Sequence, residues 1–233
     1  MATTLPPRFL SLVVHDLRTP LNVIGLTTSI LEPMAGANPE LGEEVGIIRE
    51  NVAQIERMLA HLSDFCRLGD DAIALSAEPF DPRRLAEEVI DEVASKAPSR
   101  PRPRVEHRPG CPDRVVLDPS RARQALKHAL ANALAAAADD PVRVELDGRD
   151  GRWLTRVVVD RPPPATVRST PLRPDGVERL FGTPQDRLGL ELAIVARISE
   201  LLGGTAGLDA AAGRTAIVLD WPTHLQPTMD PHR

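Results

Sequence analysis

Two runs of apolar residues in the first third of the chain recur at alternating steps of three and four positions. The first run is Leu10, Val14, Leu17, Leu21, Ile24, Thr28 and Leu31, and the second is Val45, Ile48, Val52, Ile55, Leu59, Leu62 and Cys66. This spacing places each run along one side of an α-helix as a heptad seam. Pro33, Gly36, Asn38 and Pro39 lie between the runs and predict a break with a turn. We therefore expect an antiparallel helical hairpin over residues 1–70.

The apolar stripe on each expected helix is wider than one hairpin can cover. Further apolar residues flank the seams: Leu12, Val13, Val23, Ile30, Ile47 and Met58. Two hairpins packed as a four-helix bundle would bury this surface, so we expect a homodimer. Pro20 lies inside the first seam, where its ring removes a hydrogen bond to the carbonyl of Asp16 and predicts a bend. Because the seam continues past Pro20, we expect the helix to continue as well.

Composition excludes several classes of protein. The chain has 233 residues, 42% of them apolar, which is enough for one large domain or two small ones. A net charge of -5 argues against a general nucleic-acid binder, and 3% aromatic residues argue against a base-stacking surface. We find no membrane-spanning run and no signal-peptide core, so we expect a cytoplasmic protein without a membrane partner. Cys66 and Cys111 are expected to be reduced structural thiols.

The rest of the chain alternates helical and strand patterns. Asp81-Pro82 and Asp118-Pro119 each combine a capping acid with a proline, which is typical of a helix start, and Gly203-Gly204 is typical of a helix end. The expected helices cover residues 82–93, 119–134 and 188–202, and the expected strands cover 105–107, 115–117, 142–146, 153–159, 205–208 and 215–219.

The turn and linker signals define a second domain. Asp147-Gly148 and Asp150-Gly151 mark a hairpin turn, and residues 69–79 read as a linker. The order of elements predicts an α/β sandwich over residues 76–222, with helices on one face of a mixed sheet. Residues 223–233 are expected to form a flexible tail. The whole chain is thus expected to be an α+β protein.

The stretch His15 to Leu21 places a histidine beside an acid inside the first seam. A neutral imidazole nitrogen is a competent nucleophile near neutral pH. Asp16 can accept a hydrogen bond from the other ring nitrogen, and Thr19 shares a helical face with His15 four positions away. A surface histidine without a role is the alternative interpretation.

These seven residues, His-Asp-Leu-Arg-Thr-Pro-Leu, resemble the phosphoacceptor box of two-component sensor histidine kinases. The resemblance implies that His15 accepts a phosphoryl group. It also implies that Asp16 and Thr19 support dephosphorylation of a partner regulator by positioning a water. Arg18 is either a phosphoryl contact or a surface charge, and Pro20 is a supporting position of the box.

Residues 76–222 look like the ATP-binding domain of the same family, a fold shared with gyrase-type and Hsp90-type ATPases. The family pattern Asp-x-x-Arg-x-x-Gln-x-Leu-x-Asn-x-x-x-Asn-Ala is matched from Asp118 to Ala133, and Asn132 stands at the metal-binding position. His128 replaces the first Asn of the pattern. Ala135 and Ala136 replace residues that support the nucleotide in the family.

The glycine motifs of the family are mostly lost. Asp160 begins the Asp-x-Gly-x-Gly motif, but prolines stand at both glycine positions, where they add a ring and fix φ. In the motif Gly-x-Gly-Leu-Gly-Leu only Gly189 remains, and Glu191 brings a negative charge to a helix N-terminus that would otherwise attract phosphate. Asn132, Asp160 and Gly189 therefore read as a vestigial nucleotide site. We expect no cofactor, with ATP and Mg²⁺ (on Asn132) only if the protein is an active kinase.

Three functions follow from these residues. The first is a phosphorelay protein whose His15 exchanges a phosphoryl group with the aspartates of response-regulator receiver domains. The second is an active ATP-dependent histidine kinase with an unusual site. The third is a phosphatase or a non-catalytic dimeric scaffold for a response regulator.

Overall fold

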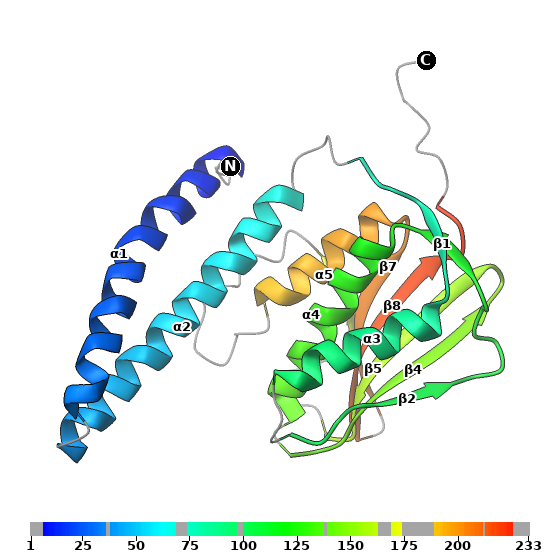
Figure 1. Cartoon of the computed structure of the whole chain (residues 1–233). Helices are drawn as coiled ribbons and strands as arrows, with labels where there is room; N and C mark the ends of the chain where they lie inside the picture. The colour runs from blue at the N-terminus through cyan, green and yellow to red at the C-terminus, as the bar shows by residue number, and fades with distance from the viewer. Residues whose placement is uncertain are drawn as a thin grey trace. The chain divides into compact units, whose positions relative to one another are not determined.

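The computed structural model describes residues 7–35, 38–68, 74–96, 100–137, 139–162, 169–173, 189–211 and 213–225. The chain forms two compact units, residues 1–73 and 74–233 (Figure 1). Within the described residues, no helix is both long and apolar enough to cross a membrane.

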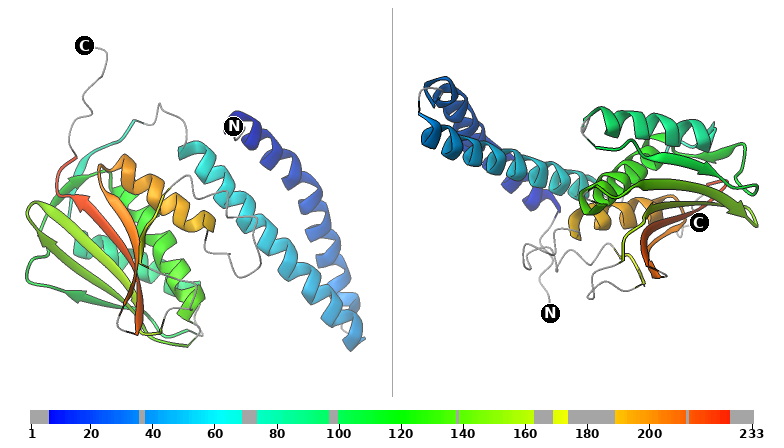
Figure 2. Two further views of the ribbon diagram at one scale, coloured as in Figure 1. Left: turned by 180° about the vertical axis from the view of Figure 1, so that it is seen from behind. Right: turned by 90° about the horizontal axis from the view of Figure 1, so that it is seen from below.

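The first unit is the predicted helical hairpin. Helix α1 spans Pro7–Ala35 and α2 spans Pro39–Leu68, and the two helices lie side by side in each view (Figure 1 and Figure 2). Pro20 and Pro33 both lie inside α1, so the helix continues past Pro20 as the seam predicted, and the break is shorter than the prolines indicated. At the start of α2 the N–H of Gly42 donates to the carbonyl of Asn38 at 3.0 Å.

Each heptad seam is divided between buried and exposed positions. Every second seam residue is buried: Val14, Leu21 and Thr28 on α1, and Val45, Val52, Leu59 and Cys66 on α2. Four of them, Val14, Leu21, Val52 and Leu59, pack together as one apolar cluster between the helices. The seam positions between them are exposed at Leu17, Ile24, Ile48 and Ile55. Contacts within one hairpin therefore bury about half of the seam residues, and the other half of the predicted heptad seam has no contact inside the hairpin that buries it.

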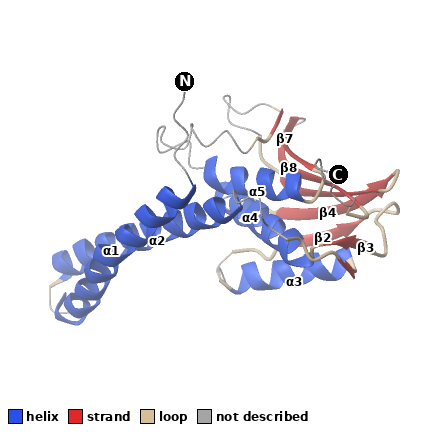
Figure 3. Ribbon diagram, turned by 90° about the horizontal axis from the view of Figure 1, so that it is seen from above, coloured by secondary structure: helices blue, strands red, loops and turns tan. Residues whose placement is uncertain are grey.

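The second unit is the predicted sandwich of helices on a mixed sheet. Its helices are α3 (Pro82–Ser95), α4 (Pro119–Ala137) and α5 (Gly189–Leu201). Its main strands are β2 (Arg104–His107), β4 (Val142–Arg149), β5 (Arg152–Val159), β6 (Thr170–Pro171), β7 (Thr205–Ala211) and β8 (Arg214–Pro222). They pair in the order β2-β4-β5-β8-β7-β6, with β2 and β4 parallel and the other neighbours antiparallel. The three helices cover one face of this sheet (Figure 2 and Figure 3).

A small second sheet joins β1 (Glu78–Phe80) to β3 (Val115–Leu117). The sequence predicted β3, but β1 falls in the segment that was expected to be linker. Thr223 and Leu225 hydrogen bond to the other side of Val116, at 2.7 and 2.8 Å. Three residues of the expected tail are thus paired with β3, and residues 226–233 lie outside the described part.

The core lies between the sheet and the helices. The rings of Trp153 and Trp221 are fully buried and meet edge to face with centroids 5.0 Å apart, and Phe80 meets Trp153 at 5.9 Å. The indole N–H of Trp221 donates to the Ser199 hydroxyl at 3.0 Å. Helix α4 packs through small side chains, because its buried alanines allow the neighbouring helices to approach closely. These alanines are Ala122, Ala125, Ala129, Ala133 and Ala137.

Acidic caps fix the starts of α3 and α4 as predicted. Asp81 accepts the N–H of Arg83 at 2.8 Å. The buried carboxylate of Asp118 accepts two N–H groups at 3.0 Å, one from Arg121 in the first turn of α4 and one from Ser76 before β1. Asp118 therefore caps a helix and holds the chain that leads into the unit.

Glycines set the predicted end of α5 and the turn of the central hairpin. Gly203 has φ +74°, and the N–H groups of Gly203 and Gly204 donate to Glu200 and Ser199, the pairing of a Schellman cap. The β4–β5 turn is made by Asp150 (φ +51°) and Gly151 (φ +73°), while the other candidate pair, Asp147-Gly148, lies inside β4. The two positive φ values fit the tight turn that joins twisted strands.

Candidate functional site

The candidate phosphoacceptor box lies inside α1, with buried residues at both ends. Val14 immediately precedes His15, and Leu21 ends the box; both are buried against α2. Seven positions separate these two anchors, so the box covers two turns of helix held at each end. The backbone of His15 and Asp16 is helical, and their side chains lie outside the described part of the structure.

The described side chains of the box are open to solvent. Arg18, Thr19 and Pro20 are all exposed, so none of them is used for packing inside the hairpin. The box therefore combines a fixed backbone with accessible polar groups, which suits a surface that must meet another protein.

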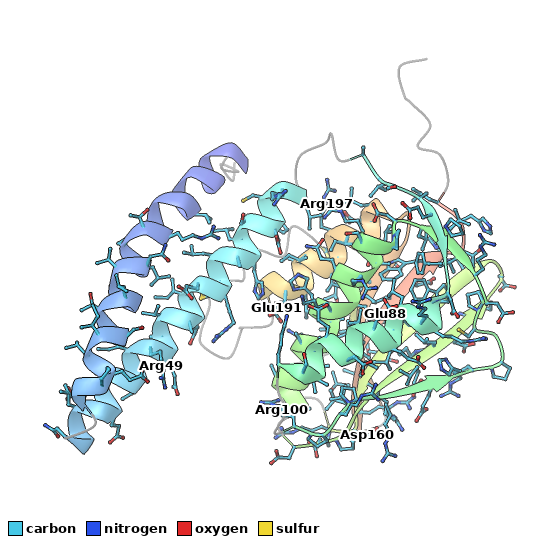
Figure 4. The ribbon with its side chains drawn as sticks, viewed as in Figure 1. Arg49, Glu88, Arg100, Asp160, Glu191 and Arg197 are labelled. Carbon is cyan, nitrogen blue, oxygen red and sulfur yellow. The ribbon has the colours of Figure 1, made fainter. Side chains whose placement is uncertain are left out.

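A second group of functional candidates lies where α4 faces the start of α5. Asn132 is 5% exposed, and its side-chain nitrogen donates to the Glu191 carboxylate at 3.4 Å. Glu191 occupies the first turn of α5, two residues after Gly189, where the helix dipole favours an acid. In Figure 4 the Glu191 label marks this first turn. The structure thus brings the predicted residues Asn132 and Gly189 to one place and adds a carboxylate there.

His128 joins this group from the preceding turn of α4. It lies four residues before Asn132, on the same side of the helix. A ring nitrogen of His128 and a carboxylate oxygen of Glu191 lie within 4.8 Å of each other. The sequence marked His128 and Glu191 only as separate departures from the family pattern. Their proximity depends on how α4 packs against α5, which the sequence did not predict.

Asp160 has a different environment from the other predicted nucleotide residues. It follows β5, and its carboxylate accepts a hydrogen bond from Arg143 of β4 at 2.9 Å. The next residue, Arg161, donates to the carbonyl of Ala136 near the end of α4 at 3.4 Å. Pro162 is exposed, and the two prolines after it lie outside the described residues. Among the described contacts, Asp160 is therefore tied to the sheet and not to Asn132 or α5.

The two cysteines are free and buried. Burial raises the pKa of the Cys66 thiol, because the charged thiolate would be removed from water. Burial also raises the pKa of Cys111, partly offset by the nearby Arg83. Both groups stay protonated near neutral pH, which fits the predicted structural thiols.

Comparison with known proteins matches both units. Residues 8–71 match the family model of the His Kinase A (phospho-acceptor) domain. Residues 117–225 match the model of the histidine kinase-, DNA gyrase B-, and HSP90-like ATPase.

Relatives and solved structures extend these matches across the chain. "Two-component system protein A" of Emericella nidulans is 24% identical over 211 residues, which cover 85% of this chain and 30% of the relative. Sensor protein TorS of Escherichia coli is 28% identical over 84% of this chain and 21% of its own length. The chain thus spans less than a third of these curated relatives.

Among solved structures, full-length ShkA in complex with AMPPNP is 26% identical with a TM-score of 0.68, over 94% of this chain and 46% of that one. Histidine kinase ThkA in complex with response regulator protein TrrA has the same fold at 18% identity. Its TM-score is 0.64, over 93% of this chain and 61% of that one.

Proposed function

This chain belongs to the two-component histidine kinase family, and from that premise we propose that it acts as a phosphorelay protein. In this proposal His15 takes a phosphoryl group from the aspartate of one response-regulator receiver domain and passes it to another. In this proposal ATP is not the donor, because several residues of the family's nucleotide site are replaced in this chain.

The observation that carries this proposal is the contact between Asn132 and Glu191. Asn132 stands at the position where the family pattern has an Mg²⁺-binding Asn. Glu191 stands at the position where the family pattern has a glycine at a helix N-terminus. Here the Glu191 carboxylate accepts a hydrogen bond from the Asn132 side-chain nitrogen at 3.4 Å. It also places a negative charge at the end of α5, where a nucleotide phosphate would need free N–H donors. The charge and the added side chain both oppose Mg-ATP.

The surroundings of Asp160 support the same conclusion. The family uses this acid to accept from the adenine amino group, but here it pairs with Arg143 at 2.9 Å. Pro162 stands where the family has a glycine, so the backbone has lost an N–H and gained a ring. These residues do not suit ATP, so the proposed transfer does not use it.

The proposed transfer needs only His15, an acid and a partner aspartyl phosphate. The neutral imidazole nitrogen attacks phosphorus, an N–P bond forms, and the P–O bond to the partner aspartate breaks. The partner's carboxylate leaves with the electron pair, and the positive charge left on the ring is offset by Asp16. The same step run in reverse loads the next receiver. Thr19, exposed one turn further along α1, would orient a water for dephosphorylation of the regulator.

The proposed working form is a homodimer. The unused halves of the two seams, Leu17 and Ile24 on α1 with Ile48 and Ile55 on α2, are exposed within one hairpin. A second hairpin would bury them as the inner layer of a four-helix bundle.

The test compares two phosphoryl donors on the full chain. One sample receives labelled ATP with Mg²⁺, and another receives receiver domains that have been phosphorylated chemically. Label on the protein from a receiver, lost in His15→Ala and kept in Asn22→Ala, is the expected result. Asn22 is the matched control, because it is exposed on α1 two turns after His15.

Each other outcome points to a named alternative. Label from ATP that depends on His15 would make the protein an active kinase and overturn the loss of nucleotide binding. Loss of phosphate from the receiver without label on His15 indicates a phosphatase. No change in any receiver of a complete panel indicates a scaffold.

A further inference from the structure

We propose that His128, Asn132 and Glu191 form a binding site for a borderline divalent cation of the Zn²⁺ or Co²⁺ class. This inference does not depend on phosphoryl transfer by His15. It concerns what the region between α4 and α5 binds.

The donors come from two neighbouring helices and converge on one place. His128 and Asn132 lie one turn apart on the same side of α4, and Glu191 faces them from the first turn of α5. The His128 ring nitrogen and the Glu191 carboxylate oxygen lie within 4.8 Å, and the Asn132 amide lies 3.4 Å from the same carboxylate. Two ligands four apart on one helix, with a third from a neighbouring helix, is how bundle proteins commonly build metal sites.

The Asn132 side chain can turn from donor to ligand without moving the helix. Its nitrogen now faces Glu191, but a half-turn of the amide places the carbonyl oxygen there instead. A cation bound to Glu191 favours that orientation, because the oxygen then faces positive charge. Asn132 is 5% exposed, so its position is fixed by packing before a cation arrives.

The chemistry of the donors selects the class of cation. Mg²⁺ and Ca²⁺ prefer a shell of oxygens, whereas an imidazole nitrogen favours Zn²⁺, Co²⁺ and related metals. The site supplies one nitrogen, one carboxylate and one amide oxygen, and the remaining positions are left to water or a further ligand. The two residues that depart from the nucleotide-binding pattern, His128 and Glu191, are the stronger ligands of the three.

The experiment titrates metal alone into the 233-residue chain, freed of any purification tag and treated with chelator. We expect one Zn²⁺ per chain by calorimetry, with visible d–d absorption when Co²⁺ is used instead. His128→Asn and Glu191→Gln should each weaken Zn²⁺ binding by more than about 100-fold, since even residues that only support a ligand cost about 10–100-fold. The matched controls are His107→Asn and Glu200→Gln, an exposed histidine on β2 and an exposed acid on α5, and they should bind Zn²⁺ like the parent.

Two further measurements keep the test decisive. Zn²⁺ should raise the melting temperature of the parent, by about 4 °C or more at saturating metal, and should not raise that of either ligand variant. The imidazole resonances of His128 should shift during the titration, which reports on ligation even if a variant folds poorly.

Unchanged Zn²⁺ affinity in both ligand variants, equal loss in the controls, or no binding by the parent would each overturn the site. Because no nucleotide or receiver is present, these outcomes are separate from those that test the relay.

Discussion

The two units of this protein differ in whether their large apolar side chains are exposed or buried. Among the described residues, the strongly exposed large apolar side chains all lie in the hairpin: Leu17, Val23, Ile24, Leu26, Ile30, Ile47, Ile48, Ile55 and Met58. In the α/β unit, by contrast, Trp153, Trp221 and the apolar faces of α3 and α4 are buried within the unit itself.

The contrast shows which unit buries its apolar surface within a single chain. A sheet with helices on one face can close its core within a single chain, because layers of side chains meet across it. Two helices have only one line of contact, so a stripe wider than that line remains open. Substitutions in the α/β unit should therefore affect folding. Substitutions among the exposed apolar residues of the hairpin, its open face, should affect association.

The largest effect is expected from Trp221→Ala. The substitution removes a fully buried indole, its edge-to-face contact with Trp153 and the partner of Ser199, and should cost about 3–5 kcal/mol. Urea denaturation measures this loss, and hydrogen exchange should place the faster-exchanging amides in residues 74–225. Equal loss of protection in α1 and α2 would break the distinction between a self-contained unit and an independent hairpin.

A charge on the open face of the hairpin should act on association alone. Ile24 is 47% exposed, so Ile24→Glu should leave the hairpin folded, yet weaken the dimer by more than about 100-fold by placing a charge in its interface. Sedimentation equilibrium measures the change, and Asn22→Glu on the same helix is the control. A parent chain that is already monomeric at micromolar concentration would refute the proposed dimer.

Removing the buried acid before α4 should have an intermediate effect. Asp118→Ala leaves the N–H groups of Arg121 and Ser76 without their acceptor, at a cost of about 2 kcal/mol. Asp118→Asn keeps one acceptor oxygen and should recover part of the loss. If the two variants are equally unstable in urea, the charge and not the hydrogen bonds holds this end of the unit together.

The smallest effect concerns pH and the surface between α3 and α4. The hydrogen bond from Lys127, and a second from Lys96, lower the pKa of Glu92 below its ordinary value. Because the folded-state pKa is the lower one, this pair stabilises the protein above the usual carboxyl range and the benefit disappears as pH falls through the folded pKa. The Glu92 side chain is 36% exposed, so the change is small and screened by salt.

Urea midpoints between about pH 7 and pH 3 measure this dependence, which is a linkage effect. Glu92→Gln should make the curve slightly flatter. A variant curve that matches the parent throughout would show that the ion pair contributes nothing measurable.

The parts of the fold that local chemistry determines could be predicted from sequence. The seams of α1 and α2, the acids before Pro82 and Pro119, and the Gly203-Gly204 cap each act within a turn or two of chain. Strand β1 was missed because Pro79 and its short length resemble a linker, and only pairing with Val115–Leu117 makes it a strand. Gly148 looked like a turn residue, but it is needed for space, since a Cβ there would lie 2.6 Å from the carbonyl of Gly110.

The candidate sites divide in the same way. The box from His15 to Leu21 is contiguous, so its residues and their likeness to a family could be read directly. The contact of Glu191 with Asn132 and the approach of His128 join positions about sixty apart in sequence and depend on helix packing. No local pattern carries that information.

Strand β3 has a mechanical consequence for the α/β unit. It is three residues long, and both edges are occupied, by β1 on one side and by Thr223–Leu225 on the other. Strand β1 and residues Thr223–Leu225 are therefore both hydrogen bonded to the same short strand, β3. A force applied between the two ends of the unit would act on these few hydrogen bonds before it reached the Trp153–Trp221 core. The hydrogen bonds of β3 would therefore set the force at which the unit unfolds.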